Sequence, residues 1–271
     1  MDEVNQDAAV TRKLAKEGDA GAQMELGYSL LPENINDPDM ESAAFWFRKS
    51  AEQGNDQAQL ELGSIYEYGM GALRDEALAL KWITKSAQQG NVSAQLTLGD
   101  KYLEGRGVPK NQEEGLKWYK KAVNAGYAAA QACLGLKYHY GDLIEQDFDK
   151  AAKYFQMAAK QNNAVAQRLL GAAYYYGRGV QIDNSKAIHW LLKAAAQQDA
   201  DAHMYLGFNA YTGNQDSLPD MVAAYMWFWL ADYYGNSDGL AAVNDTSESM
   251  DQTQIKKAEV LIGKKLGESI R

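Results

Sequence analysis

Small and large apolar residues recur along the chain with a period of 36 residues. An Ala-Gln pair, written Ala-His in its sixth copy, begins at Ala22, Ala58, Ala94, Ala130, Ala166 and Ala202. Four positions later comes a Leu-Gly pair, whose leucines are Leu26, Leu62, Leu98, Leu134, Leu170 and Leu206. Four copies extend the stripe with Tyr66, Tyr102, Tyr138 and Tyr174. Because residues four apart share a helix face, each copy predicts an amphipathic helix.

A second stripe in the same phase predicts a second helix in every copy. Its large residues are Trp46, Trp82, Trp118, Tyr154, Trp190 and Met226. Three residues earlier stand the small residues Ala43, Ala79, Gly115, Ala151, Ala187 and Ala223. A small residue beside a large one on the same face lets a neighbouring helix approach closely and fill the gap.

Helix-ending residues separate the two stripes. The first helices are expected to take their N-caps from Asp19, Asn55, Asn91, Asn163 and Asp199, with Tyr127 as the exception. The second helices are expected to take theirs from Asp39, Asp75, Asn111, Asp147 and Asp183, with Pro219 in the sixth place. Glycines that suit a left-handed helix end stand at Gly18, Gly54, Gly90 and Gly126 and at Gly69, Gly105, Gly141, Gly177 and Gly213.

Helix pairs of this size must stack on their neighbours to bury their stripes. The sequence therefore predicts an all-α, right-handed α/α solenoid of six helix-pair repeats, 19–54, 55–90, 91–126, 127–162, 163–198 and 199–234. Residues 1–18 are expected to form an N-terminal capping helix, with Val10 aligned to the tryptophan positions and Leu14 one turn on. Residues 235–271 are expected to form a loop to residue 250 and then a C-terminal capping helix, begun by a capping box of Asp251 and Gln254.

The repeat resembles the Sel1-like repeat (SLR), a relative of the tetratricopeptide repeat. The resemblance rests on Ala-Gln-x-x-Leu-Gly-x-x-Tyr-x-x-Gly-x-Gly-Val, followed by x-x-Lys-Ala-x-x-Trp-x-x-Lys-Ala-Ala-x-x-Gly, and the best copies are 94–126 and 166–196. The 36-residue period and the Gly-Arg-Gly-Val turns at 105–108 and 177–180 favour this family over the tetratricopeptide type, whose period is about 34 residues. The first repeat departs from the pattern at residues 30–33, and the sequence after Met226 is similar to the ending of bacterial members.

The resemblance implies a protein that binds other proteins. Family members scaffold complexes, act in envelope and signalling assemblies, mediate host contact, or serve as immunity proteins against secreted toxins. A non-enzymatic adaptor that holds a protein or peptide partner in a concave groove is therefore expected. The alternatives are an immunity protein that binds a secreted toxin, a β-lactam or peptidoglycan hydrolase, and a structural oligomer in which residues 227–229 pair two copies. The hydrolase activity belongs to a disulfide-rich branch, from which this chain departs because Cys133 is its one cysteine.

Charge and composition narrow the partner. A net charge of −9 opposes binding to nucleic-acid phosphates and anionic membranes, so a basic or neutral protein is expected. No apolar run approaches the ~20 residues that cross a bilayer, and the first residues lack an export signal. The chain is thus expected in the cytoplasm, or in the periplasm if a signal was removed. His139, His189, His203 and Cys133 have no partners at ligand or triad spacing, so no metal, cofactor or nucleophile is predicted.

The tetratricopeptide analogy predicts which residues line the groove, because the first helix of each pair faces the concave side. The expected partner contacts are Tyr68, Asp100, Glu104, His139, Tyr140, Arg168, Tyr175, Tyr176, Phe208 and Tyr211. Glu67, Asp100 and Glu104 make the N-terminal half acidic, and tyrosines make the C-terminal half aromatic. Tyrosine gives a large contact area at low entropic cost. The alternatives are that the tyrosines pack on adjacent loops and that the carboxylates form a solvated face.

Overall fold

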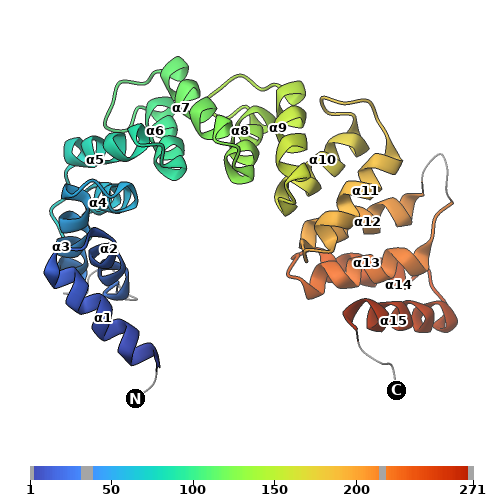
Figure 1. Ribbon diagram of the computed structural model, residues 1–271. Helices are drawn as coiled ribbons and strands as arrows, with labels where there is room; N and C mark the ends of the chain where they lie inside the picture. The colour runs from blue at the N-terminus through green and yellow to red at the C-terminus, as the bar shows by residue number, and fades with distance from the viewer. Residues whose placement is uncertain (1–2, 32–38, 214–217, 268–271) are drawn as a thin grey trace. The chain divides into compact units, whose positions relative to one another are not determined.

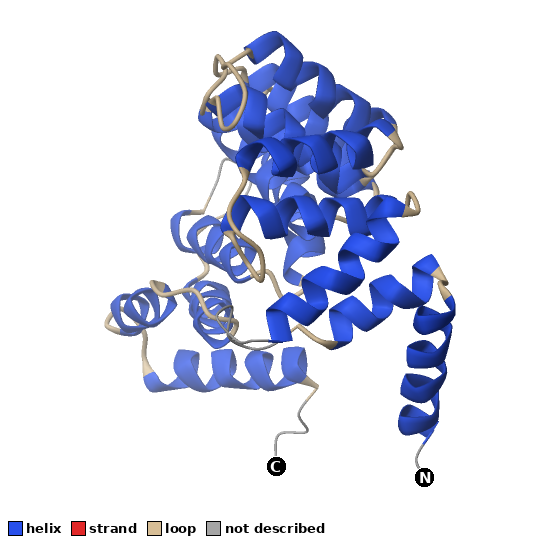
Figure 2. Cartoon of the chain, turned by 90° about the vertical axis from the view of Figure 1, so that its left-hand side faces the viewer, coloured by secondary structure: helices blue, strands red, loops and turns tan. Residues whose placement is uncertain are grey.

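The computed structural model describes residues 3–31, 39–213 and 218–267, and over these residues it has fifteen helices and no strand (Figures 1 and 2). The first helices of the six pairs are α2 (Ala20–Ser29), α4 (Asp56–Tyr68), α6 (Val92–Glu104), α8 (Ala128–Tyr140), α10 (Ala164–Tyr176) and α12 (Ala200–Thr212). The second helices are α3 (Asp39–Glu52), α5 (Glu76–Gln88), α7 (Gln112–Asn124), α9 (Phe148–Lys160), α11 (Asn184–Ala195) and α13 (Met221–Tyr233). The remaining helices are α1 (Glu3–Glu17), α14 (Gly239–Ser247) and α15 (Gln252–Leu266). The predicted all-α fold of helix pairs is confirmed.

The chain divides into two compact units, Met1–Ala130 and Gln131–Arg271. Within each unit the helices that pack together are mainly sequence neighbours, such as α4 with α5 and α10 with α11. Each unit is therefore built from local helix-to-helix contacts.

The helix ends follow the predicted cap residues. Asn91 Oδ1 accepts a hydrogen bond from the backbone N–H of Ala94 at 2.9 Å, and the same bond is made by Asp19, Asn55, Asn163 and Asp199. The second helices repeat it with Asp75, Asn111, Asp147 and Asp183. Both bonds of the Asp251–Gln254 capping box are present. Asp39 begins α3, and neither its side chain nor residues 32–38 of the atypical first turn lie in the described part.

The glycine of each Leu-Gly pair makes room for a large side chain from the second helix of its repeat. A Cβ on Gly99 would lie 2.7 Å from the ring of Tyr119, and one on Gly171 would lie 2.7 Å from Leu191 Cγ. The large buried residues in this position are Phe47, Ile83, Tyr119, Phe155, Leu191 and Phe228. In the first five repeats they stand one residue after the large residue of the predicted second stripe, and in the sixth Phe228 stands two residues after Met226. Trp82 and Trp190 are half-buried, each beneath a lysine three residues later.

Repeat six carries one extra residue between its two helices. The N-cap of α13 is Asp220, which follows Asp183 by 37 residues (220 − 183). The predicted positions Pro219, Ala223 and Met226 are therefore wrong by one residue, and their places are taken by Asp220, Ala224 and Trp227. This shift brings Phe228 against Gly207, where the earlier repeats place their own large residue.

The predicted loop at 235–250 is wrong, because α14 lies within it. Gly235 has a φ of 99°, like Gly90 at 100°. Asn236 Nδ2 donates to Asp201 Oδ1 at 2.8 Å, as Asn91 Nδ2 donates to Asp56 Oδ2 at 3.0 Å. Gly239 and Val243 then take the buried places of the Ala-x-x-x-Leu stripe. α14 therefore resembles a shortened first helix, and both α14 and α15 pack on α13.

The N-terminal capping helix is present as α1, but it packs through a different residue from the one expected. Ala15 is buried against Ala22 and Leu26, whereas Val10 and Leu14 are exposed. The short alanine lets the backbone of α1 approach α2 closely. The aligned valine therefore stays outside the core.

Candidate partner-binding surfaces

Predicted contact residues of repeats four and five lie together in the unit 131–271. The ring centres of His139 and Tyr140, at the end of α8, are 4.9 Å apart in an edge-on contact. The His139 ring lies 5.5 Å from that of Phe148, the first residue of α9. The turn after the first helix is thus lined with rings on both sides.

Arg178 joins this group to the next repeat. Its guanidinium carbon lies 5.7 Å from the Phe148 ring centre and 5.1 Å from that of Tyr176. Tyr176 in turn lies 6.2 Å from Tyr205 of α12. Cation–π contacts at exposed sites contribute about 0.5–1 kcal/mol each, so Arg178 favours an arrangement in which it lies against rings of two repeats. We call His139, Tyr140, Phe148, Tyr176, Arg178 and Tyr205 the aromatic array.

Two rings of the aromatic array face solvent. Tyr140 is 67% exposed and Tyr176 is 50% exposed, whereas Tyr175 beside it is half-buried. Tyr138 lies in the core. The tyrosines therefore divide into packed residues and residues whose rings are open to a partner.

Phe208 and Tyr211, both on α12, form a second exposed aromatic pair. Their rings rest on the buried ring of Phe228, with centres 5.2 and 6.5 Å away. Among the described residues, no ring contact joins them to the aromatic array. Phe228 itself is buried, so its side chain is not available for the alternative in which residues 227–229 pair two copies.

Arg168 is tied to acidic residues of the next repeat. Its Nε lies 3.2 Å from Asp199 Oδ1, and its Nη1 lies 3.4 Å from Asp201 Oδ2. Asp199 also caps α12. Arg168 therefore links α10 to α12, and its charge is balanced by neighbouring carboxylates.

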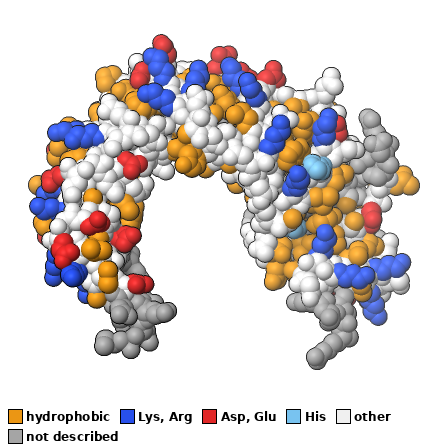
Figure 3. Space-filling model, in the orientation of Figure 1, with side chains coloured by type: hydrophobic (Ala, Val, Ile, Leu, Met, Phe, Trp, Pro, Cys, Tyr) orange, Lys and Arg blue, Asp and Glu red, His pale blue; other side chains and the backbone are white. Residues whose placement is uncertain are grey.

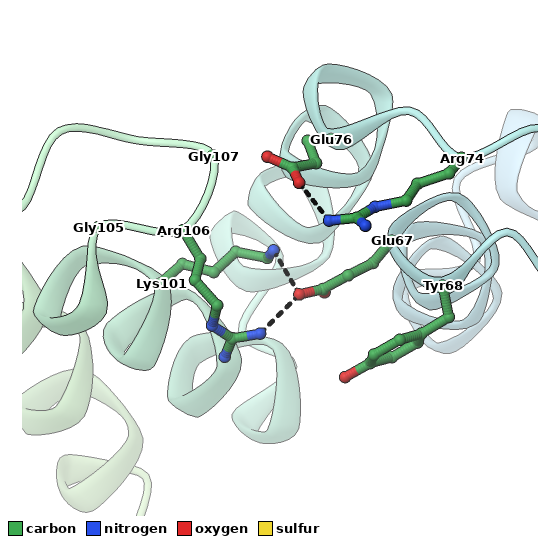
Figure 4. A pocket seen from close by; sticks show the side chains of 8 residues that line it. All are labelled: Glu67, Tyr68, Arg74, Glu76, Lys101, Gly105, Arg106 and Gly107. Atoms are coloured by element: carbon green, nitrogen blue, oxygen red, sulfur yellow. Dashed lines mark hydrogen bonds and ion pairs between the residues drawn. The ribbon is translucent and has the colours of Figure 1, made fainter.

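Glu67, one of the acidic residues of the N-terminal half, lines a cavity of about 520 Å³ in the unit 1–130. The Glu67 side chain, 10% exposed, lies between Lys101 Nζ at 2.8 Å and Arg106 Nη1 at 2.7 Å (Figure 4). Glu104 accepts a hydrogen bond from Arg106 Nε, and Asp100 Oδ1 accepts one from the Tyr119 hydroxyl at 2.7 Å. All three carboxylates of the predicted acidic half thus make ion pairs or hydrogen bonds within the unit 1–130.

Tyr68 also lines this cavity, and its ring is exposed. Tyr68, Asp100 and Glu104 belong to the unit 1–130, whereas the other seven predicted contacts belong to the unit 131–271. One groove through all ten predicted contacts stays a prediction.

Two histidines have a pKa below the ordinary value. Burial lowers the pKa of His139, and the positive charge of Arg178 lowers it further. Burial also lowers the pKa of His203, whose Nδ1 lies 2.8 Å from the backbone oxygen of Asp199. His139 is therefore neutral near pH 7, and Arg178 carries the positive charge of the aromatic array. Nowhere in the described chain do three His, Cys, Asp or Glu side chains come together as metal ligands do.

Sequence reasoning missed Phe148, Arg178 and Tyr205. The groove prediction used repeat positions on one face of the first helices. Arg178 instead lies in a turn, and Phe148 begins a second helix. The Gly-Arg-Gly turn at 177–179 was visible in the sequence, but it indicated a helix end and gave no sign of ring contacts.

The sequence matches the Sel1 repeat family over residues 20–55, 56–91, 92–127, 128–163, 164–199 and 200–231. The chain is 31% identical to a Sel1 repeat protein from Oxalobacter formigenes. The match to its crystal structure covers 80% of this chain and 88% of the Oxalobacter chain, with a TM-score of 0.66. The protective antigen c5321 of uropathogenic Escherichia coli is 23% identical, with coverage of 93% and 69% and a TM-score of 0.49. The immunity protein Pa5087 from Pseudomonas aeruginosa is 21% identical, with coverage of 84% and 81% and a TM-score of 0.48.

No curated protein sequence matches the chain. Among the described helices, none has the length and apolar character that crossing a membrane requires.

Proposed function

Because the chain belongs to the Sel1 repeat family, whose repeats commonly mediate protein–protein interaction, we propose that it is a non-catalytic adaptor that binds a protein or peptide partner through the aromatic array. The observation that supports this proposal is the pair of exposed rings in the aromatic array: Tyr176 lies against the guanidinium of Arg178, and Tyr140 packs on the ring of His139.

The chemistry of the aromatic array suits protein recognition. Tyrosine and arginine are, with tryptophan, the side chains enriched among those that dominate binding energy at protein interfaces. Arg178 already rests between Phe148 and Tyr176, so it loses little rotational freedom when a partner binds. A preordered arginine between rings can donate hydrogen bonds to a backbone carbonyl or a carboxylate while the rings cover apolar groups.

Electrostatic steering by the N-terminal half is not part of this proposal, because Glu67, Asp100 and Glu104 are engaged within the protein. The net charge of −9 still favours a basic or neutral partner at long range. An immunity protein that binds a secreted toxin would be a narrower form of the same adaptor. The likeness to Pa5087 shows the fold alone. The hydrolase alternative has no supporting observation among the described residues.

The test is affinity capture from a lysate of the source organism, followed by calorimetric titration of the purified partner. The Tyr140→Ala/Tyr176→Ala variant leaves the half-buried Tyr175 in place, so its helicity should match that of the unmodified chain. We expect its Kd to rise at least tenfold, about 1.4 kcal/mol. The matched control is Leu73→Ala/Leu218→Ala, which removes two exposed side chains outside the aromatic array and should leave Kd unchanged. Equal affinity in all three proteins would place the partner elsewhere.

A further inference from the structure

The second unit ends in a helix whose outer face carries apolar side chains. α15 packs on α13 through Ala258 and Ile262, and beside this contact Tyr233, Val260 and Leu261 are 58%, 40% and 37% exposed. Exposed apolar groups gathered in this way mark an interaction surface.

Two adjoining hollows make up the surface. The larger, about 650 Å³, lies between α13 and α15 and includes Tyr225, Trp229 and Leu266. The smaller, about 460 Å³, includes Val222 and Leu261. Both hollows are lined by Lys256 and Val260, so they form one continuous surface, which we call the α13–α15 groove.

The groove has the dimensions of a helix-binding site. Its α13 wall is a single stripe at spacings of three, four and four residues, made by Val222, Tyr225, Trp229 and Tyr233. The rings of Trp229 and Tyr233 stack with centres 5.4 Å apart, which stiffens this wall. α15 has 15 residues and is therefore about 22 Å long, enough for three to four turns of another helix. Gly263 in the floor lets a helix approach closely.

Charge selects among the possible occupants. α15 contains four lysines and one acidic residue, Glu259, in a chain whose net charge is −9. In Figure 3 blue side chains gather where α15 lies in Figure 1. Lys256 and Lys257 line the groove, and Lys264 is exposed. Lys265 lies over Trp227, at 5.0 Å from the ring centre. An occupant with acidic flanks would pair with the first three lysines.

A second copy of the chain suits the groove less well. Two α15 helices packed together would bring like charges into contact. The exposed Val10 and Leu14 of α1 are neighboured by Arg12, Lys13 and Lys16 and also by Asp7 and Glu17. That ridge therefore lacks the net negative charge that would pair with Lys256 and Lys257. Like-charge contacts across an interface cost several kcal/mol.

We propose that the α13–α15 groove binds an amphipathic helix of a partner protein, one whose apolar ridge is flanked by acidic residues. The groove shares no residue with the aromatic array, so this proposal does not depend on the proposed function.

The test uses the full chain and two fluorescently labelled helical peptides of ~18 residues, with leucines on one face and either glutamates or lysines on its flanks. Binding is followed by fluorescence anisotropy. We expect the glutamate peptide to bind at least tenfold more tightly than the lysine peptide. Val260→Asp/Leu261→Asp should weaken binding of the glutamate peptide at least tenfold. Leu240→Asp, at an exposed leucine of α14 outside the groove, should leave it unchanged.

Charge reversal separates this site from a merely sticky surface. Lys256→Glu/Lys257→Glu should exchange the preference, so that the lysine peptide becomes the tighter ligand. Equal binding of both peptides, or a preference that survives the reversal, would overturn the proposal. The proposal also fails if light scattering shows a dimer that Val260→Asp/Leu261→Asp dissociates, since a second copy would then fill the groove. Loss of binding to phosphatidylserine vesicles in the same variant would assign the groove to a membrane instead.

Discussion

At the scale of single residues, the buried glutamines of the first helices are held by hydrogen bonds of their side-chain amides. Gln59 Nε2 donates to the backbone oxygen of Ala51 at 3.1 Å, and Gln59 Oε1 accepts from Gln89 Nε2 at 2.8 Å. The partner stands thirty residues after each buried glutamine, as Gln53, Gln89, Gln161 and Gln197 show. In the third repeat Ala125 occupies that place, and Gln95 Oε1 is buried without a partner.

Replacing Ala125 by glutamine should therefore stabilise the protein. Position 125 is exposed, so the longer side chain has room to reach Gln95. Satisfying one buried acceptor is worth about 1 kcal/mol, and the free energy of unfolding in urea should rise by that amount in Ala125→Gln. The reverse change, Gln89→Ala, strips Gln59 of its donor and should lower the same free energy by a similar amount. If Ala125→Gln were neutral while Gln89→Ala is costly, Gln95 would already be satisfied by water.

The sequence predicted cap residues well and these glutamine pairs not at all. A cap bonds to a backbone N–H two or three residues away, so its chemistry can be read from the local sequence. The partner of Gln59 lies on another helix, and the identity of that residue varies between repeats. In repeat six the pair is replaced by rings, because His203 lies 5.1 Å from Tyr234.

At the scale of helices, each pair is locked by a glycine of the first helix and a large residue of the second. Gly171→Ala should destabilise the protein by about 1–3 kcal/mol, because the new methyl group would meet Leu191. Leu191→Ala should cost about 2–5 kcal/mol. The double variant should cost clearly less than the sum, since removing the leucine carbons gives the methyl group space. Urea unfolding measures all three. Gly171→Ala combined with Ile83→Ala, whose side chain lies in the other unit, is the control and should be additive.

The helix pairs of repeats two to five were predictable because their stripes, caps and glycines all repeat at 36 residues. The prediction failed where that agreement ends. One inserted residue moved the second helix of repeat six, and fixed spacing then placed Ala223 and Met226 in positions that belong to Ala224 and Trp227. α14 escaped detection because it has lost the Leu-Gly pair and keeps only Gly239 and Val243.

At the scale of the whole molecule, the candidate site was harder to predict than the fold. The fold depends on contacts within a repeat and with its neighbours, which periodic sequence encodes directly. The aromatic array joins residues of a first helix, a turn and a second helix, such as Tyr176, Arg178 and Phe148. The exposed rings of the array do not need to recur in every repeat. The periodic pattern of the sequence therefore does not identify them. The pairing of Glu67 with Lys101 and Arg106 was hidden for the same reason.

Mainly local packing also sets how far a perturbation travels through the chain. In a repeat protein, stability is approximately a sum of repeat terms and nearest-neighbour terms. Gly171→Ala in α10 should therefore speed amide hydrogen exchange in α9 to α12 and leave α2 to α5 unchanged. Gly63→Ala, whose new methyl would lie 2.5 Å from Ile83 Cγ1, should do the reverse: faster exchange in α4, α5 and their neighbours, with α12 to α15 unchanged. Mass spectrometry of peptide fragments resolves the two patterns. A uniform increase along the chain in either variant would mean that both units open in one cooperative step, contrary to the short reach that mainly local packing predicts.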